Sequence, residues 1–192
     1  GVGRPFDGLR KDAAQDEVAR LEARGAIPGF RPPLNRDTIL RLARTSDVES
    51  RLVSRQRGKW QLEHGPHARS RFAQLPPTNW TVLVQGVNLH DAACDALLRR
   101  FDFIPAARLD DLMVSLAVRE GGVGPHVDSY DVFLLQGEGR RRWRISSQKD
   151  RRMVAGAPLA VLADFRPEQE WILECGDMLY LPPHIAHEGT AL

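Results

Sequence analysis

The sequence predicts a mainly β fold with a few flanking helices, arranged as a small barrel or sandwich. Two observations support this prediction. From about residue 50 onward, short β-prone runs alternate with Gly, Pro and Asp, a spacing that is typical of compact all-β architectures. The length of 192 residues suits one sizeable hydrophobic core and hardly two.

The composition indicates a soluble globular protein of a reducing compartment. Hydrophobic residues make up 42% of the chain and charged residues 27%, which is unlike a disordered protein. No apolar run approaches the roughly 20 residues needed to cross a membrane, and the polar, basic start is unlike a signal peptide. We therefore expect a cytoplasmic protein with no membrane partner. The net charge of +2 is too small to argue for direct nucleic-acid binding.

Residues 1–49 predict a helical and loop segment that packs on a β barrel formed by residues 50–192. Over residues 8–25, apolar side chains recur at helical spacing: Leu9, Ala13, Val18 and Leu21. A Pro- and Gly-rich loop follows. A second helix is expected at about 37–45, capped by Asn35 or Asp37.

The remaining sequence predicts one short helix and a series of short strands. Gly58 marks a hairpin turn between Arg51–Ser54 and Lys59–Leu62, and Trp80–Val84 is a strongly β-prone run. The helix is expected over residues 90–101. The further strands are expected at Leu112–Val118, Val132–Gln136, Arg142–Ile145, Val161–Leu162, Glu170–Leu173 and Met178–Leu181.

A candidate metal site lies in the segment that contains His126 and Asp128. Residues i and i+2 of a strand point to the same face, so this imidazole and this carboxylate can aim at one point. His187, which follows a turn, a strand and a Pro-Pro corner, is the candidate third ligand. Two His and one carboxylate form the facial triad of non-haem iron(II) oxygenases, which leaves positions open for other ligands.

Other histidines and the two cysteines are interpreted without a catalytic role. A His-x-Asp pair by itself is common, and His184 competes with His187 as the third ligand. We prefer His187, because the corner position of His184 suits an unusual backbone that His sometimes tolerates. Three more, His64, His67 and His90, lie in turn-like contexts and are expected at the surface. Cys94 and Cys175 match no paired metal motif and are expected to be buried.

A Gly-rich turn leads into an Arg-rich strand over residues 140–144. Strand alternation places Arg141 and Trp143 on one face and Arg140, Arg142 and Arg144 on the other, solvent-exposed face. An inward Arg141 could hold the distal carboxylate of 2-oxoglutarate by a bidentate ion pair.

A substrate pocket is predicted from Asp111, Met113 and Tyr130. Asp111, Met113 and Ser115 alternate along one predicted strand, and Tyr130 shares a face with His126 and Asp128. A carboxylate, a flexible thioether and an aromatic ring suit a guanidinium group. The alternative is that Asp111 caps a turn and that Met113 and Tyr130 belong to the core.

Several of these segments together resemble the ribosomal oxygenases of the Jumonji C (cupin-type) superfamily. The residues that carry the resemblance extend over about 25–192: Asp47–Ser54, Gly58–Gln61, Asp110–Ser115, Gly121–Phe133, the stretch Gly137–Arg144, and Pro182–Gly189. They are most similar to the bacterial branch that hydroxylates an arginine in a large-subunit ribosomal protein. The resemblance implies a double-stranded β-helix, iron(II) held by His126, Asp128 and His187, and 2-oxoglutarate held by Arg141, thirteen positions after Asp128.

The resemblance also implies an Fe(II)- and 2-oxoglutarate-dependent protein hydroxylase that uses O2 as its second co-substrate. Members of this family continue past the second His into a closing barrel strand, a dimerisation region and a winged-helix-like domain. Only five residues follow His187 here, so we expect these parts to be absent from this sequence and homodimerisation to belong to the full-length protein. Histidine hydroxylation, N-methyl demethylation and a non-catalytic cupin binding module stay open as alternatives.

Overall fold

The computed structural model describes residues 21–192, which divide into two compact units. One unit joins residues 21–32 to 123–192, and the other comprises residues 33–122. The packing of residues 1–49 on a barrel of residues 50–192 stays a prediction. Among the described residues, no helix combines the length and the apolar character that a membrane span requires.

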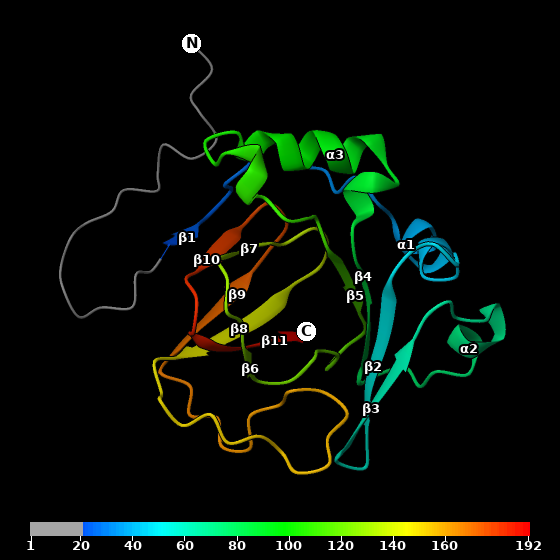
Figure 1. Cartoon of the computed structure of the whole chain (residues 1–192), viewed down its shortest axis with the longest axis vertical. Helices are drawn as coiled ribbons and strands as arrows, with labels where there is room; N and C mark the ends of the chain where they lie inside the picture. The colour runs from blue at the N-terminus through cyan, green and yellow to red at the C-terminus, as the bar shows by residue number, and fades with distance from the viewer. Residues whose placement is uncertain (1–20) are drawn as a thin grey trace. The chain divides into compact units, whose positions relative to one another are not determined.

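Most of the helix predicted over residues 8–25 lies outside the described residues. Its end is not helical, because Leu21–Ala23 forms strand β1, which pairs antiparallel with β10 (Figure 1). The helical spacing in the sequence does not detect this pairing, since a three-residue strand at a sheet edge is stabilised by hydrogen bonds to its neighbour. The prediction of a helix is therefore wrong for residues 21–23.

The unit of residues 33–122 is built on a four-stranded antiparallel sheet in the order β3-β2-β4-β5. Its strands are β2 (Ser50–Gln56), β3 (Lys59–His64), β4 (Trp80–Val84) and β5 (Val114–Ala117). The predicted hairpin is confirmed: Gln56 pairs with Lys59, and both turn residues, Arg57 and Gly58, have positive φ. Two positive φ values are typical of a type I′ turn, whose twist matches that of the strands it joins.

Short helices flank this sheet. The α-helices are α1 (Arg36–Leu42), α2 (Arg69–Ala73) and α3 (Ala92–Leu98), and the 3-10 helices are η1 (Val87–Leu89), η2 (Arg99–Phe101) and η3 (Ala106–Arg108). Asn35 caps α1 by accepting from the Thr38 N–H, and Asp91 caps α3 in the same way. Buried side chains of α1, β2 and β4, among them Ile39, Leu52 and Val82, form the hydrophobic core of this unit.

The other unit contains two antiparallel sheets in the orders β1-β10-β7 and β6-β11-β8-β9. Their remaining strands are β6 (His126–Val127), β7 (Val132–Leu135), β8 (Arg141–Ser146), β9 (Gln169–Leu173), β10 (Met178–Leu181) and β11 (Ala186–Ala191). The predicted strand at Val161–Leu162 is reduced to a single bridge between Met153 and Leu162. Leu134, Leu179 and Leu181 from the first sheet pack with Trp143, Ile145 and Leu173 from the second.

Strand β11 contains His187 and was not among the strands predicted from the sequence. The expectation that a closing strand beyond it is absent stays a prediction. All six residues of β11 pair with β8 on one side, and its first two, Ala186 and His187, pair with β6 on the other (Figure 1). The strand begins at Ala186, one residue before His187, so the third predicted ligand lies within a strand. The strand forms because both neighbouring strands supply backbone hydrogen-bond partners.

Two further expectations about burial are wrong. His67 is buried, with 6% of its surface exposed, and its ring contacts Phe72 edge-on. Cys175 is exposed, whereas Cys94 is buried as predicted. Turn-like sequence around His67 indicates only the local backbone, and whether other residues cover the side chain is decided by the fold.

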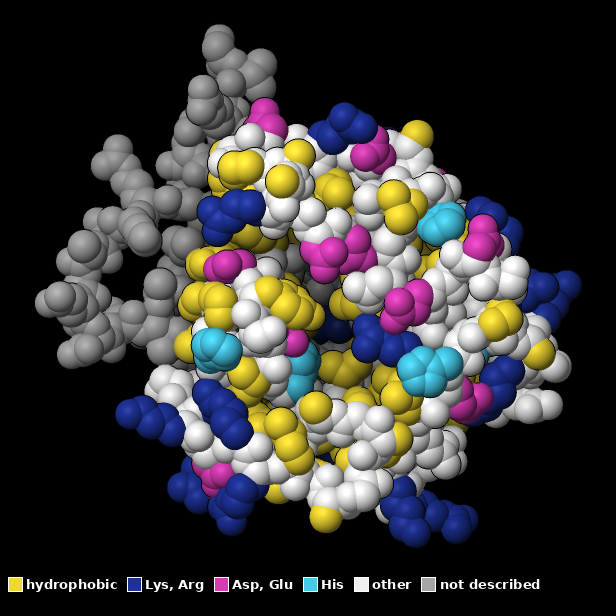
Figure 2. Space-filling view, viewed as in Figure 1, with side chains coloured by type: hydrophobic (Ala, Val, Ile, Leu, Met, Phe, Trp, Pro, Cys, Tyr) yellow, Lys and Arg dark blue, Asp and Glu magenta, His cyan; other side chains and the backbone are white. Residues whose placement is uncertain are grey.

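The charged side chains do not gather into a single patch on the face drawn in Figure 2. Lys and Arg side chains there lie in several separate groups, with Asp and Glu side chains among them. This arrangement accords with the small net charge of +2. The expectation of no direct nucleic-acid binding stays a prediction.

Candidate metal centre

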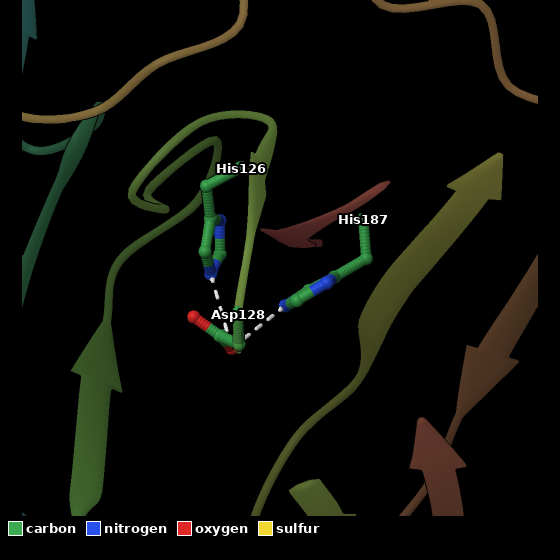
Figure 3. A group of neighbouring side chains, drawn as sticks. All are labelled: His126, Asp128 and His187. Carbon is green, nitrogen blue, oxygen red and sulfur yellow. Dashed lines mark ion pairs between the residues drawn. The ribbon is translucent and has the colours of Figure 1, made fainter. Parts of the chain in front are cut away.

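Two short stretches of the unit that contains β6 and β11 bring His126, Asp128 and His187 together (Figure 3). His126 opens β6 and pairs directly with His187 of β11, so the two imidazoles lie side by side with ring centroids 4.2 Å apart. Asp128 follows β6 directly and points to the same place, as the i, i+2 spacing predicts.

The three side chains converge on one point. Oδ2 of Asp128 lies 3.8 Å from Nε2 of His126 and 3.5 Å from Nε2 of His187. Their ligand atoms all lie within 4.8 Å of one another, and no further His, Cys, Asp or Glu of residues 21–192 joins the group. Two nitrogens and one carboxylate oxygen gathered on one side suit iron(II) and leave coordination positions for other molecules.

Backbone carbonyls fix the orientation of both imidazoles. Nδ1 of His126 lies 2.9 Å from the Gly124 carbonyl oxygen, and Nδ1 of His187 lies 2.9 Å from that of Ile185. A carbonyl oxygen only accepts, so each Nδ1 carries the proton and donates it. Each Nε2 is then the unprotonated nitrogen and faces Asp128, which is the arrangement of a histidine that binds metal.

The surroundings of His187 keep its ring neutral. Only 2% of this residue is exposed. Desolvation by burial and the neighbouring His126 lower the pKa of His187 to about 4. A neutral imidazole offers its lone pair to a metal at physiological pH without first losing a proton.

The register of β8 places Arg141 on the same sheet face as His187. Ile145 is opposite His187, Trp143 opposite Gly189 and Arg141 opposite Ala191, and directly opposed residues share a face. The Arg141 guanidinium lies 5.8 Å from the centroid of the Trp143 ring, which in turn is 6.0 Å from the His187 ring. Although the residue is half-buried as a whole, desolvation of its guanidinium lowers the pKa of Arg141 to about 10.

The neighbouring arginines lie on the other face, in agreement with the predicted alternation, but only Arg140 is exposed as predicted, whereas Arg142 and Arg144 are half-buried. Arg144 forms an ion pair with Glu188 of β11, and Arg142 lies 4.0 Å from Glu170 of β9. Arg140 is exposed and precedes β8. Arg141 is thus the one arginine of β8 whose register puts it on the His187 face.

The residues predicted for the substrate pocket belong to both units. Asp111 accepts hydrogen bonds from the Gly86 N–H at 2.6 Å and from the Gln85 side chain at 3.4 Å, which is the turn-capping role that the sequence left open. Met113 and Tyr130 are 44% and 62% exposed, so neither is a core residue. A substrate-binding role for Asp111, Met113 and Tyr130 stays a prediction.

Two residues near the site were missed by sequence reasoning. Gly189 is one of them: a Cβ at this position would meet the Trp143 ring at 2.6 Å. A glycine two residues after the candidate ligand His187 was the available signal, but only the β8–β11 register reveals what it faces. The other is Arg151, which donates to the backbone carbonyl of His184 at 2.8 Å. His184 itself is exposed and has a φ of 68°, as its corner position predicted.

Comparison with known proteins identifies relatives over most of the chain. An Escherichia coli protein described as ribosomal protein uL16 3-hydroxylase is 46% identical over 164 residues, which cover 85% of this chain and 43% of the relative. A probable ribosomal oxygenase of Haemophilus influenzae is 33% identical over 185 residues, which cover 89% of this chain and 43% of the relative. The chain thus spans less than half the length of these curated relatives.

The fold comparison agrees. The solved structure of Escherichia coli YcfD, a ribosomal oxygenase in complex with cobalt and 2-oxoglutarate, matches with a TM-score of 0.81 and 43% identity over 90% of this chain and 45% of that one. This match confirms the predicted mainly β fold of the cupin type. A family model described as the JmjC domain matches residues 96–192, about half of the sequence. The chain therefore belongs to the JmjC domain family, and within it is similar to bacterial ribosomal oxygenases.

Proposed function

We propose that the protein containing this chain is an Fe(II)- and 2-oxoglutarate-dependent dioxygenase that hydroxylates a protein side chain. The observation that supports this most directly is the convergence of His126, Asp128 and His187 on one point, with Arg141 on the same sheet face. A non-catalytic cupin module has no need of a half-buried arginine on that face.

Each residue has a defined role in this proposal. His126 and His187 bind iron(II) through Nε2, and Asp128 binds it through a carboxylate oxygen. When bound, iron with 2-oxoglutarate and O2 supplies the oxidising power for hydroxylation of a C–H bond. Arg141 holds the distal carboxylate of the co-substrate, and the Trp143 ring separates this arginine from His187. The positively charged guanidinium on a largely desolvated face favours a dianionic partner there.

The proposed substrate is an arginine of a large-subunit ribosomal protein. The description of the Escherichia coli relative supports a ribosomal protein as the substrate and makes uL16 the first candidate. Tyr130 lies in the same unit as His126, Asp128 and His187, and its exposed ring can stack on a guanidinium. The substrate-binding roles of Asp111 and Met113, which belong to the other unit, stay predictions. Anchoring the guanidinium leaves the carbons near the backbone free to approach the metal. We further propose that the full-length protein is cytoplasmic and homodimeric.

The test uses the full-length protein with iron(II), ascorbate and 2-oxoglutarate on matched peptides of uL16. One peptide keeps the target arginine, and its partners carry lysine, histidine or N-methylarginine there. Mass spectrometry should find one added oxygen atom on the arginine peptide alone. Added oxygen on the histidine peptide only would identify a histidine hydroxylase. Loss of a methyl group as formaldehyde from the N-methylarginine peptide would identify a demethylase. If no peptide supported 2-oxoglutarate turnover, the protein would be a binding module.

A further inference from the structure

The loop between β8 and β9, residues 147–168, contacts the segments that carry the proposed ligands at two places. The Leu162 N–H donates to the carbonyl of Pro125, the residue before His126, at 2.8 Å. Nη2 of Arg151 donates to the carbonyl of His184, three residues before His187, at 2.8 Å. One loop therefore fastens the chain ahead of each histidine of the metal centre.

The turn between β10 and β11 is bonded to two of the three proposed ligands. Pro182 and Pro183 have no N–H, so the first backbone donor after β10 is that of His184. It donates to the Asp128 carbonyl at 2.8 Å. The next carbonyl, that of Ile185, accepts the Nδ1–H of His187 at 2.9 Å. A shift of this turn therefore moves the backbone of Asp128 and the ring of His187 together.

This turn needs support from outside its own backbone. His184 has a φ of 68°, in the left-handed region that residues with a Cβ rarely adopt. The peptide unit of His184 is held at both ends: its N–H donates to Asp128, and its carbonyl accepts from Arg151. Arg151 is the side chain that locks the carbonyl end.

The guanidinium of Arg151 is itself held in place by its own loop. It also donates to the backbone carbonyls of Gln148 and Asp150, so within the described part of the chain all its recorded acceptors are backbone carbonyls. The Gln148 side chain ties the loop together by donating to the carbonyls of Asp150 and Asp164 at 2.9 and 2.8 Å and by accepting from the Arg166 N–H. A planar guanidinium can bridge fixed carbonyls in this way, whereas a lysine ammonium lacks the rigid fork.

We propose that Arg151 is a positioning residue of the metal centre: it holds the His184 turn and thereby aligns Asp128 and His187 for metal binding. This inference rests on the proposed metal site. Arg151 acts without touching the metal, in the way that partners outside the ligand set orient ligands in other metal proteins. Loss of Arg151 therefore weakens metal affinity while the rest of the fold persists.

The experiment measures binding of Co(II) alone to the metal-free full-length protein, by its visible absorption and by calorimetry. Arg151→Met should weaken Co(II) binding about tenfold, the lower end of what such outer partners contribute. Arg151→Lys keeps the charge but loses the planar guanidinium, so its Co(II) affinity should lie between that of Arg151→Met and that of the wild type. The matched control is Arg152→Met, because the Arg152 side chain is 76% exposed and pairs only with Asp150 among the described residues. It should bind Co(II) like the wild type.

Changes at His184 test whether Arg151 acts through the turn. His184→Gly accommodates the left-handed backbone and should keep the wild-type affinity, whereas His184→Val should weaken binding as Arg151→Met does. The double change Arg151→Met with His184→Val should cost less than the two single effects added together. Full additivity would mean that the two residues act independently and would overturn the proposal.

The thermal midpoint of the metal-free protein separates positioning from general stability. If Arg151→Met and Arg151→Lys lower this midpoint but leave the Co(II) affinity unchanged, the positioning role is wrong. Failure of the metal site itself would look different, because the wild type and Asp128→Ala would then bind Co(II) equally weakly.

Discussion

The indole ring of Trp143 lies directly against the backbone of Gly189, the residue opposite it on β11. A Cβ on Gly189 would stand 2.6 Å from the ring, closer than real Cβ contacts come. The same ring is 6.0 Å from the His187 ring, and its centroid is 5.8 Å from the Arg141 guanidinium carbon. The absence of a side chain at position 189 therefore determines where the Trp143 ring lies between His187 and Arg141.

Replacing Gly189 with Ala should displace the Trp143 ring. The overpacked ring should cost about 1–3 kcal/mol of unfolding free energy and raise the Michaelis constant for 2-oxoglutarate. Urea unfolding and initial rates at varied 2-oxoglutarate measure the two effects. Thr190→Ala, on the opposite face of the strand, is the control. Adding Trp143→Phe to Gly189→Ala should recover part of the stability, and no recovery would mean that the ring does not cause the loss.

Removing the carboxylate of Asp128 should abolish 2-oxoglutarate turnover. The two histidines that remain offer only neutral nitrogens, so the site loses both a ligand and the negative charge that balances a divalent ion. Asp128→Ala should leave the far-ultraviolet circular dichroism and the thermal midpoint of the metal-free protein nearly unchanged. Succinate formation, followed by nuclear magnetic resonance, provides the measurement. Normal turnover by this variant would sink the assignment of the metal centre.

Replacing Arg141 with Ala should raise the Michaelis constant for 2-oxoglutarate at least tenfold. The lost pair is charge-assisted and partly buried, and its truncation costs about 2–5 kcal/mol of binding. Arg140→Ala is the matched control, because Arg140 is exposed and precedes β8. The rates at saturating 2-oxoglutarate should differ less than the Michaelis constants do. Equal effects of the two substitutions would contradict the role that strand register assigns to Arg141.

The buried His67 should make stability depend on pH. Desolvation lowers its pKa, Arg71 and His64 lower it as well, and Glu63 opposes the shift. Nε2 of His67 is buried and has no hydrogen-bond partner among residues 21–192. The folded state therefore prefers the neutral ring. This preference stabilises the fold fully above pH 6.5 and is lost as the pH falls from about 6.5 toward the lower folded-state value.

Unfolding of the metal-free protein in urea at pH 7.5 and pH 5.5 tests whether the free energy of unfolding decreases as the pH falls. His67→Phe keeps an aromatic ring against Phe72 and removes the titration, so its stability should fall less than that of the wild type between these two pH values. His90→Gln, at an exposed position, should behave like the wild type. If His67→Phe lost stability as steeply as the wild type, other groups would be responsible.

The convergence of His126 and Asp128 at the candidate metal centre was predictable from the sequence because it depends on residue types and on a period of two. His126 and Asp128 share a face in any extended backbone, and the same alternation separates Arg141 from Arg140 and Arg142. The turn at Arg57 and Gly58 was predictable for a similar local reason, since glycine adopts positive φ at little cost. These features can be predicted without knowing which residues lie opposite them in the fold.

Features that depend on a partner far along the chain were decided only by the tertiary structure. Residues 186–191 do not look strongly β-prone, yet they form β11 because β6 and β8 offer hydrogen bonds on both sides. His67 is buried and Cys175 exposed according to what packs over each of them. Arg151 contacts His184 across a separation of 33 residues. Sequence periodicity records which way a side chain points, whereas the neighbour that it meets there depends on pairing register and long-range packing.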